Sequence, residues 1–130
     1  MSFVYLDTSV AIAHILAEDR VPAADLWHES LISSRLLEYE LWNRIHSRKL
    51  AKTHGDAIRE LVGRTAIIEL IGPILDRARE PFPAPTCTLD SLHLASMVFL
   101  IENAQSVKLA SYDVQMKKAA RSLGIPLWKV

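Results

Sequence analysis

The stretch Phe3-Val4-Tyr5-Leu6-Asp7-Thr8-Ser9 sets an apolar run directly before an acidic residue and two hydroxyl residues. A short continuous apolar run is typical of a fully buried strand, and Thr8 and Ser9 are residue types that cap helices. The stretch therefore predicts a strand that turns at once into a helix, as in the βα units of a parallel sheet. Asp7 is expected at the carboxyl end of this strand.

The same alternation of apolar runs and helical periods continues along the chain, so we expect an α/β fold with a mainly parallel sheet of four to five strands. The predicted strands are Phe3–Leu6, Leu31–Ser34, Ala66–Leu70 and Val107–Ala110, with Pro126–Val130 as the short fifth. The predicted helices are Ser9–Ala17, Leu36–Ala51, His54–Gly63, Pro73–Arg79, Thr88–Glu102 and Tyr112–Leu123.

Helix boundaries are predicted from capping residues and glycines. Gly55 and Gly63 bracket the third predicted helix, and Thr88 is the expected N-cap of the fifth. Gly124 stands just past the last helix, where a left-handed residue commonly ends one. The fifth helix is apolar almost all round, which predicts that it is buried.

The composition fits one globular domain, residues 1–130, with 50% hydrophobic and 23% charged residues, and it excludes a disordered chain. The 15 basic and 15 acidic residues cancel, so overall charge favours neither a nucleic acid nor a membrane as partner. The one cysteine, Cys87, is expected to be partly buried and cannot form an internal disulfide. Together with the absence of a long apolar span, this predicts a cytoplasmic protein without a membrane anchor.

Four acidic residues fall where a parallel α/β sheet binds ligands, outside the carboxyl ends of its strands. Asp7 and Asp113 follow the first and last long strands, Glu40 lies early in the helix after the second strand, and Asp90 lies in the first turn of the buried helix. Taken singly, each suits a helix cap or a helix dipole. Brought together, they would repel one another unless a cation lay between them. Oxygen ligands without a cysteine or histidine favour Mg²⁺ or Mn²⁺ over zinc.

Four segments together resemble the signature segments of the PIN domain, and more closely those of VapC-type toxins from bacterial toxin–antitoxin pairs. The segments are Val4-Tyr5-Leu6-Asp7-Thr8-Ser9, Ser34-Arg35-Leu36-Leu37-Glu38-Tyr39-Glu40-Leu41, Pro81-Phe82-Pro83 with Thr88-Leu89-Asp90-Ser91-Leu92-His93-Leu94-Ala95, and Ala110-Ser111-Tyr112-Asp113. They span nearly the whole chain in the family's order. The resemblance implies a three-layer sandwich with helices on both faces of the sheet.

The resemblance also implies a metal-dependent endoribonuclease that hydrolyses phosphodiester bonds of tRNA or rRNA. A water activated on Mg²⁺ or Mn²⁺ would attack the phosphate and leave a 5′-phosphate and a 3′-hydroxyl. The catalytic and metal-binding residues carried over from the family are Asp7, Glu40, Asp90 and Asp113.

Two positions bear on how the family's site residues apply to this sequence. Glu38 lies two residues before Glu40, about 200° away on a helix, so only one of them can face the site. The family spacing from Ser34 selects Glu40. Met116 stands where many PIN proteins have a further Asp or Asn, which argues against a firmly held second metal.

Three further residues have a supporting role in the predicted site. Thr8 and Ser111 would orient carboxylates or metal-bound waters, although capping or turn chemistry explains their positions equally well. His93 follows Asp90 by three residues on the same helix face, where it either supports the site or is a satisfied core histidine.

Basic residues beside the acids are the predicted RNA contacts, because phosphate contacts dominate affinity for nucleic acids. The RNA-binding candidates are Arg35, Arg44, Arg48 and Lys117. The alternative is that these charges only form a solvated helix face. If four acids belong to the metal site, 11 acidic residues remain against 15 basic ones, which leaves a mildly basic surface.

The resemblance implies two protein partners. One is a VapB-type antitoxin whose C-terminal segment would place an arginine among the carboxylates. The other is a second copy of the chain in a homodimer, for which the first half of the chain is the expected surface, with Trp27, Leu31, Tyr39 and Trp42.

Two other functions compete with this interpretation. A catalytically silent PIN module would bind RNA or protein without cutting, but such a module has no reason to keep four repelling acids. A haloacid-dehalogenase-like phosphatase would use Asp7 as its nucleophile. That chemistry requires a second Asp two residues on, where this chain has Ser9.

Overall fold

The computed structural model describes residues 1–130 and contains one sheet of four parallel strands. The strands are β1 (Ser2–Leu6), β2 (Leu31–Ser34), β3 (Ala66–Ile68) and β4 (Ser106–Ala110). Their order across the sheet is β3-β2-β1-β4, so the chain builds outward from β1 through β2 to β3 and then returns to the other side of β1. The topological switch point therefore lies between β1 and β4, which is where open parallel sheets bind ligands.

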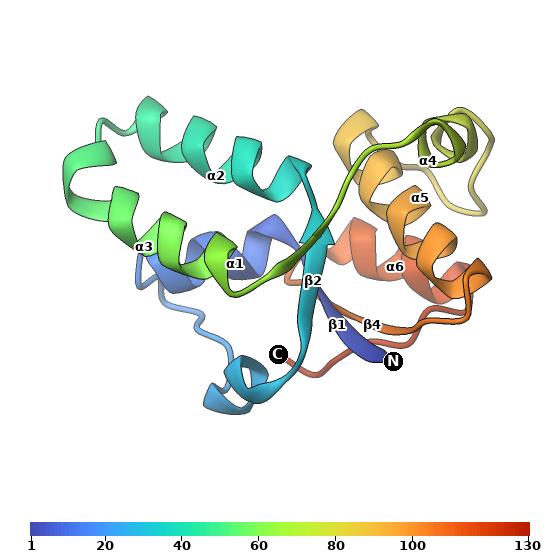
Figure 1. The fold of residues 1–130 in the computed structure, drawn as a ribbon, viewed down its shortest axis with the longest axis horizontal. Helices are drawn as coiled ribbons and strands as arrows, with labels where there is room; N and C mark the ends of the chain where they lie inside the picture. The colour runs from blue at the N-terminus through green and yellow to red at the C-terminus, as the bar shows by residue number, and fades with distance from the viewer.

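Six α-helices and one short 3₁₀ helix connect these strands. They are α1 (Thr8–Ile15), η1 (Ala24–His28), α2 (Leu36–Ser47), α3 (Ala51–Gly63), α4 (Gly72–Ala78), α5 (Thr88–Glu102) and α6 (Val114–Ser122). Figure 1 shows α1, α2 and α3 on one side of the sheet and α4, α5 and α6 on the other. Right-handed crossovers require this division, because the chain moves across the sheet in opposite directions before and after β3.

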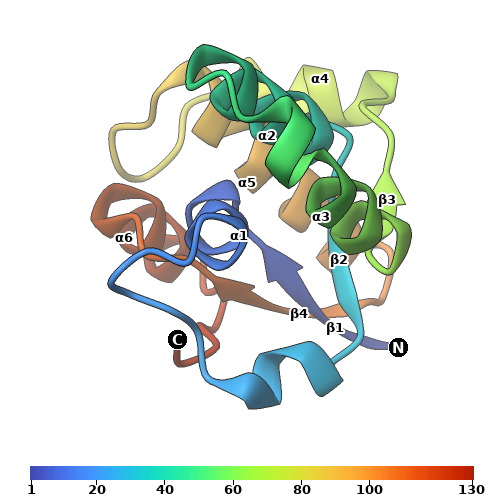
Figure 2. The ribbon, with the colours of Figure 1, turned by 90° about the vertical axis from the view of Figure 1, so that its left-hand side faces the viewer.

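Two apolar cores lie between the helices and the sheet, one on each face. Val4 and Leu6 of β1 point to α1, α2 and α3, whereas Tyr5 between them points to α5 and α6. This period of two is that of a strand with both faces covered, which explains why β1 is an uninterrupted apolar run. Figure 2, which faces α1, α2 and α3, shows η1 below these three helices. The predicted three-layer α/β sandwich is confirmed.

One helix boundary differs from the prediction because of a left-handed residue. The expected helix Leu36–Ala51 ends at Ser47, since Lys49 has φ +57° and a new helix begins at Ala51. The Leu50 amide bonds the Ile45 carbonyl and the Lys49 amide bonds the His46 carbonyl, which is a Schellman motif. Gly124, with φ +75°, ends α6 in the same way, as its glycine predicted.

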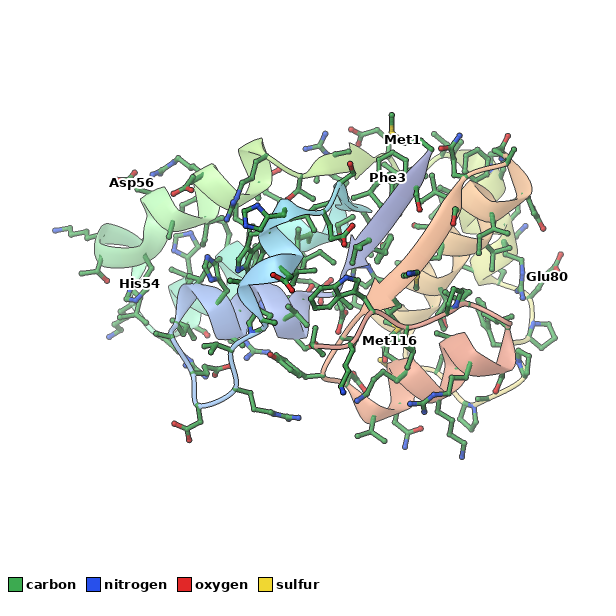
Figure 3. All side chains as sticks on the ribbon, turned by 90° about the horizontal axis from the view of Figure 1, so that it is seen from below. Met1, Phe3, His54, Asp56, Glu80 and Met116 are labelled. Carbon is green, nitrogen blue, oxygen red and sulfur yellow. The ribbon has the colours of Figure 1, made fainter.

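Gly55 does not bracket a helix but lies inside α3, where α2 and α3 approach closely. A Cβ at this position would lie 3.0 Å from Cη2 of Trp42. The glycine therefore serves helix packing and not a turn. Figure 3 shows His54 and Asp56, at the start of this helix, at one end of the molecule, with Glu80 at the opposite end.

Three smaller expectations are wrong. Pro126–Val130 forms no fifth strand, because its pairing with β4 is limited to a single bridge between Leu109 and Leu127. Thr88 is the first helical residue of α5 rather than its N-cap, since the extended residue before the helix is Cys87. The Cys87 side chain is exposed rather than partly buried. By contrast, the expected burial of α5 is confirmed for the middle of the helix, because the consecutive residues 93–97 are all buried and together cover every side of it.

No helix of the structure is long and apolar enough to cross a bilayer.

The buried middle of α5 generates a stability prediction. Leu94 is fully buried and Ile101, on the same helix, is 41% exposed. Leu94→Ala should lower the free energy of unfolding by about 2–5 kcal/mol, because it leaves a cavity in the core between α5 and the sheet. Ile101→Ala should change it by about 1 kcal/mol or less. Urea denaturation of both variants measures the difference, and equal losses would contradict the assigned core.

Candidate metal-binding site

Asp7 is a buried carboxylate, 5% exposed, held at the point where β1 ends. Its backbone amide continues the ladder to β4 by donating to the Ala110 carbonyl at 3.0 Å. Its Oδ2 accepts hydrogen bonds from the hydroxyls of Ser9, at 2.6 Å, and Ser111, at 2.7 Å. These two donors satisfy one oxygen of the buried charge and leave Oδ1 without a protein partner.

Asp113 is held by the start of α6. It is the N-cap of that helix, and its Oδ1 accepts from the amides of Gln115 and Met116 at 2.9 and 3.1 Å. Its own amide donates to Ser111 Oγ at 3.0 Å, so the serine that bonds Asp7 also positions Asp113. Asp113 Oδ2 has no protein partner. Capping and the candidate site therefore use different oxygens of the same carboxylate.

Glu40, on α2, reaches across the carboxyl edge of the sheet to α5. Its Oε1 lies 2.6 Å from His93 Nε2, and the other ring nitrogen of His93 lies 2.7 Å from the Tyr5 hydroxyl. Glu38 turns to the opposite side, where it pairs with Arg35. Of the two glutamates, Glu40 is thus the one that contacts α5, the helix that also carries Asp90.

Asp90, in the first turn of α5, is half-buried. Its pKa is raised, mainly by burial; the neighbouring Cys87 thiol acts in the opposite direction, and the negative charges of Asp113 and Asp7 add to the rise. The carboxylates of Asp113 and Asp7 are therefore close enough to Asp90 to repel its charged form. Asp90 and Asp113 also line one cavity of about 600 Å³.

The four acids gather at one edge of the sheet but not into a compact ligand cluster. No three acidic, histidine or cysteine side chains are close enough together to hold one metal ion. Mg²⁺ does not require three, because it keeps several waters and is commonly bound through one or two carboxylates. The donor set fits such an ion: it is all oxygen, with free atoms on Asp7, Glu40 and Asp113. Thr8 Oγ1, buried directly after Asp7, has no hydrogen-bond partner.

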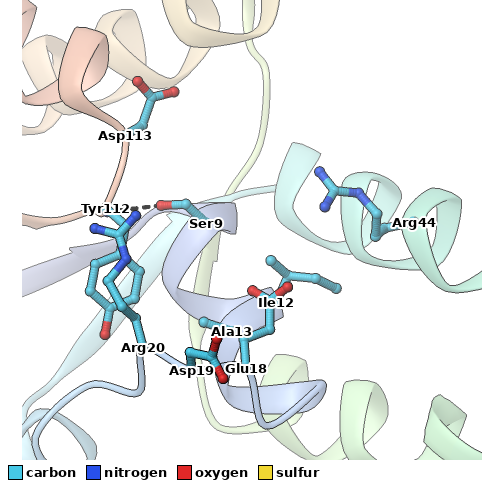
Figure 4. A pocket seen from close by; sticks show the side chains of 9 residues that line it. All are labelled: Ser9, Ile12, Ala13, Glu18, Asp19, Arg20, Arg44, Tyr112 and Asp113. Carbon is cyan, nitrogen blue, oxygen red and sulfur yellow. Dashed lines mark hydrogen bonds between the residues drawn. The ribbon is translucent and has the colours of Figure 1, made fainter.

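A second cavity, of about 470 Å³, lies on the other side of Asp113 and carries two arginines (Figure 4). Arg44 reaches it from α2, and Arg20 lies over the Tyr112 ring, 4.8 Å from its centroid. The Tyr112 hydroxyl is buried without a partner. Glu18 and Asp19 line the same cavity, so its two cationic groups lie among carboxylates beside Asp113.

Unlike Arg44, the other predicted RNA contacts do not line the cavities beside Asp113. Arg35 pairs with Glu38 and Glu69. Arg48 is exposed at the C-terminal end of α2. Lys117 lines a small cavity with the C-terminal segment, whereas its neighbour Lys118 lines the cavity of Asp90 and Asp113.

Sequence reasoning missed several side chains that hold the site together. Ser9, taken only as a helix start, is a donor to Asp7 and accepts from the Tyr112 amide at 3.0 Å. Tyr5, whose sequence context indicates only a strand residue, has its hydroxyl 2.7 Å from His93 Nδ1. Arg20 also lines a cavity beside Asp113. For Ser9, a signal was present in its position two residues after a strand-end acid.

The fold and this site agree with a comparison to known families. The model of the family described as "PIN domain" matches residues 4–122, which is most of the chain, so the protein belongs to the PIN domain family. A search of curated proteins finds no match. PIN domains are typically nucleases that use divalent metal ions.

The raised pKa of Asp90 predicts a pH-dependent effect on stability. A carboxyl whose pKa is raised by folding stabilises the folded state below its ordinary pKa, and that contribution is lost as the pH rises through the folded pKa. In EDTA at pH 7, Asp90→Asn should therefore melt above the wild type, and the gap should close toward pH 4. Asp76→Asn, on the exposed side of α4, is the control. A lower melting temperature for Asp90→Asn at pH 7 would contradict the electrostatic account.

Proposed function

We propose that the protein is a divalent-metal-dependent endoribonuclease of the VapC toxin type, which hydrolyses phosphodiester bonds in tRNA or rRNA. The observation that carries the proposal is the state of its carboxylates at the β1–β4 switch point. Asp7, Asp113 and Glu40 each have one oxygen fixed by protein donors and the other free. Carboxylates fixed in this way are preorganised for a cation, since their orientation does not have to be established when it binds.

Mg²⁺ or Mn²⁺, when bound, would lower the pKa of a coordinated water and neutralise charge on the scissile phosphate. Asp7 Oδ1 and Asp113 Oδ2 would hold the ion directly, and Asp90 and Glu40 Oε2 would bind its waters, since no three of these side chains are close enough to share one ion. Ser9 and Ser111 keep Asp7 in place, and Thr8 Oγ1 is available to a water of the ion. None of these residues needs to act as a nucleophile.

The two cavities beside Asp113 support a path for RNA across the acids. One contains Arg44 and Arg20 and the other contains Lys118. Phosphates on either side of the scissile bond would meet these cations while the bond itself lies over the carboxylates.

The proposal includes a VapB-type antitoxin, a homodimer and a cytoplasmic site of action, where tRNA and rRNA are found. An arginine of the antitoxin would bind the same free carboxylate oxygens that the metal uses. Of the residues expected at the dimer surface, Leu31 is buried and Trp27 and Trp42 pack on the core, whereas Tyr39 is 62% exposed. Exposed apolar side chains also lie on α4 and α5, where Leu75 lines a groove between the two helices.

The two competing functions are supported less well. Membership in the PIN family disfavours a haloacid-dehalogenase-like phosphatase, and Ser9 bonds Asp7 where that enzyme would need an acid. A silent binding module would gain nothing from two serine donors that preserve a buried carboxylate charge.

Cleavage of total tRNA or rRNA with Mg²⁺ or Mn²⁺ tests the activity. Loss of an outer partner of a metal site commonly costs 10- to 100-fold, so removing a proposed ligand should cost at least about 100-fold. Asp7→Asn and Asp90→Asn should therefore lose cleavage to that extent, whereas Glu102→Gln, at the exposed end of α5, should cleave like the wild type. Equal cleavage by all four proteins, or none by the wild type, would refute the proposal.

The proposed RNA path makes a separate prediction for Arg44. If this side chain contacts one phosphate, Arg44→Ala should weaken RNA binding and reduce the slope of log K against log salt by about 0.7–0.9. The measurement is made in the Asp90→Asn background with tRNA, so that the RNA stays intact. Arg59→Ala, on α3 and paired with Asp56, is the matched control. Identical salt slopes for Arg44→Ala and Arg59→Ala would show that Arg44 does not contact a phosphate of the RNA.

A further inference from the structure

His93 is a buried histidine, 1% exposed, whose two ring nitrogens are both engaged. Nδ1 lies 2.7 Å from the Tyr5 hydroxyl of β1, and Nε2 lies 2.6 Å from Oε1 of Glu40 on α2. Three elements, β1, α2 and α5, therefore meet through one side chain. A core histidine needs partners, but it does not need a carboxylate that belongs to a neighbouring site.

The partners fix which nitrogen carries the proton. An ionised carboxylate only accepts hydrogen bonds, so Nε2 must be the donor to Glu40. In the neutral ring Nδ1 then accepts, and the Tyr5 hydroxyl donates to it. Burial raises the pKa of Tyr5, which keeps its phenol protonated and able to donate. The chain of donors thus runs from Tyr5 through His93 to Glu40.

This chain links the two faces of the sheet. Glu40 extends from α2, in the layer that covers Val4 and Leu6, whereas His93 belongs to α5 in the opposite layer. The two helices do not pack along each other. The hydrogen bond between them passes over the carboxyl edge, where the other acids lie. It engages Oε1 of Glu40 and leaves Oε2 free.

We propose that His93 is a positioning residue that fixes the Glu40 carboxylate for the divalent cation, with Tyr5 setting the ring tautomer. This inference rests on the proposed metal-dependent function and adds that binding of the cation depends on His93. Without His93, Glu40 would extend from α2 with a freely rotating carboxylate and would have to be ordered when the ion binds. Outer partners of metal ligands act in this way, by orienting ligands before the ion arrives.

Two substitutions separate positioning from a structural role. The amide nitrogen of Gln reaches the place of His Nε2, and the amide of Asn reaches the place of Nδ1. His93→Gln therefore keeps a donor to Glu40 and loses the partner of Tyr5, whereas His93→Asn keeps a partner for Tyr5 and loses the donor. Tyr5→Phe removes the hydroxyl that sets the tautomer of His93, and it leaves the Glu40 carboxylate and the His93 ring in place.

The readout is the dissociation constant for Mn²⁺, measured by calorimetry on the full chain without RNA, together with the melting temperature in EDTA. His93→Asn should bind Mn²⁺ about 10- to 100-fold more weakly than the wild type, and His93→Gln should stay within about threefold. Tyr5→Phe should lie between them. A core role alone would lower the melting temperature of both His93 variants without separating their Mn²⁺ affinities.

Equal Mn²⁺ affinities of His93→Asn and His93→Gln overturn the inference, as does a wild type that binds no Mn²⁺. Should His93→Asn fail to fold, Tyr5→Phe decides: unchanged Mn²⁺ affinity counts against the chain of donors, and a weaker affinity supports it. The proposed nuclease can fail separately. In that case the wild type binds Mn²⁺ and the variants separate as expected, but no RNA is cut.

Discussion

The site depends on one constraint, which is that the Asp7 carboxylate is buried at the end of the central strand β1. A buried charge is unfavourable unless donors and counter-charge surround it, and Ser9 and Ser111 supply two donors to one oxygen. Ser111 stands at the end of β4, so this bond also joins the two strands at the switch point. It then positions Asp113 through the backbone. The order β3-β2-β1-β4 is what brings these residues together, although they are far apart in sequence.

Most of the fold was predictable from local pattern. The strands β1 and β2, the helix α5 and the left-handed end of α6 at Gly124 all carry signals that depend only on neighbouring residues. The break between α2 and α3 was predicted a few residues too late, because Lys49 occupies the left-handed position in which a glycine would have indicated the end of α2. The missing fifth strand has a similar cause. Leu127 has the right residue type, but the segment that ends at Val130 forms only one bridge with β4.

The site was predictable as residue identities but not as hydrogen bonds. Strand-end position alone selected Asp7 and Asp113, and the family spacing selected Glu40 over Glu38. The sequence holds no signal that Tyr5, in the middle of an apolar strand, reaches His93, because that contact depends on how α5 crosses the sheet. It equally holds no signal for the free oxygens. These follow from which atom of each carboxylate the serines, the α6 amides and His93 occupy, and only tertiary packing decides that.

The central claim is that protein donors hold one oxygen of Asp7, Asp113 and Glu40 and leave the other for a divalent cation. The most direct measurement is a crystal structure grown with Mn²⁺, with the ion located by its anomalous scattering. The account predicts one ion about 2.0–2.2 Å from Asp7 Oδ1 and Asp113 Oδ2, with waters completing its octahedron and the Ser9 and Ser111 bonds intact. Asp90 and Glu40 should face the same ion. An ion bound through Asp7 Oδ2 with the serine bonds broken, or no ion at the switch point at millimolar Mn²⁺, would contradict it.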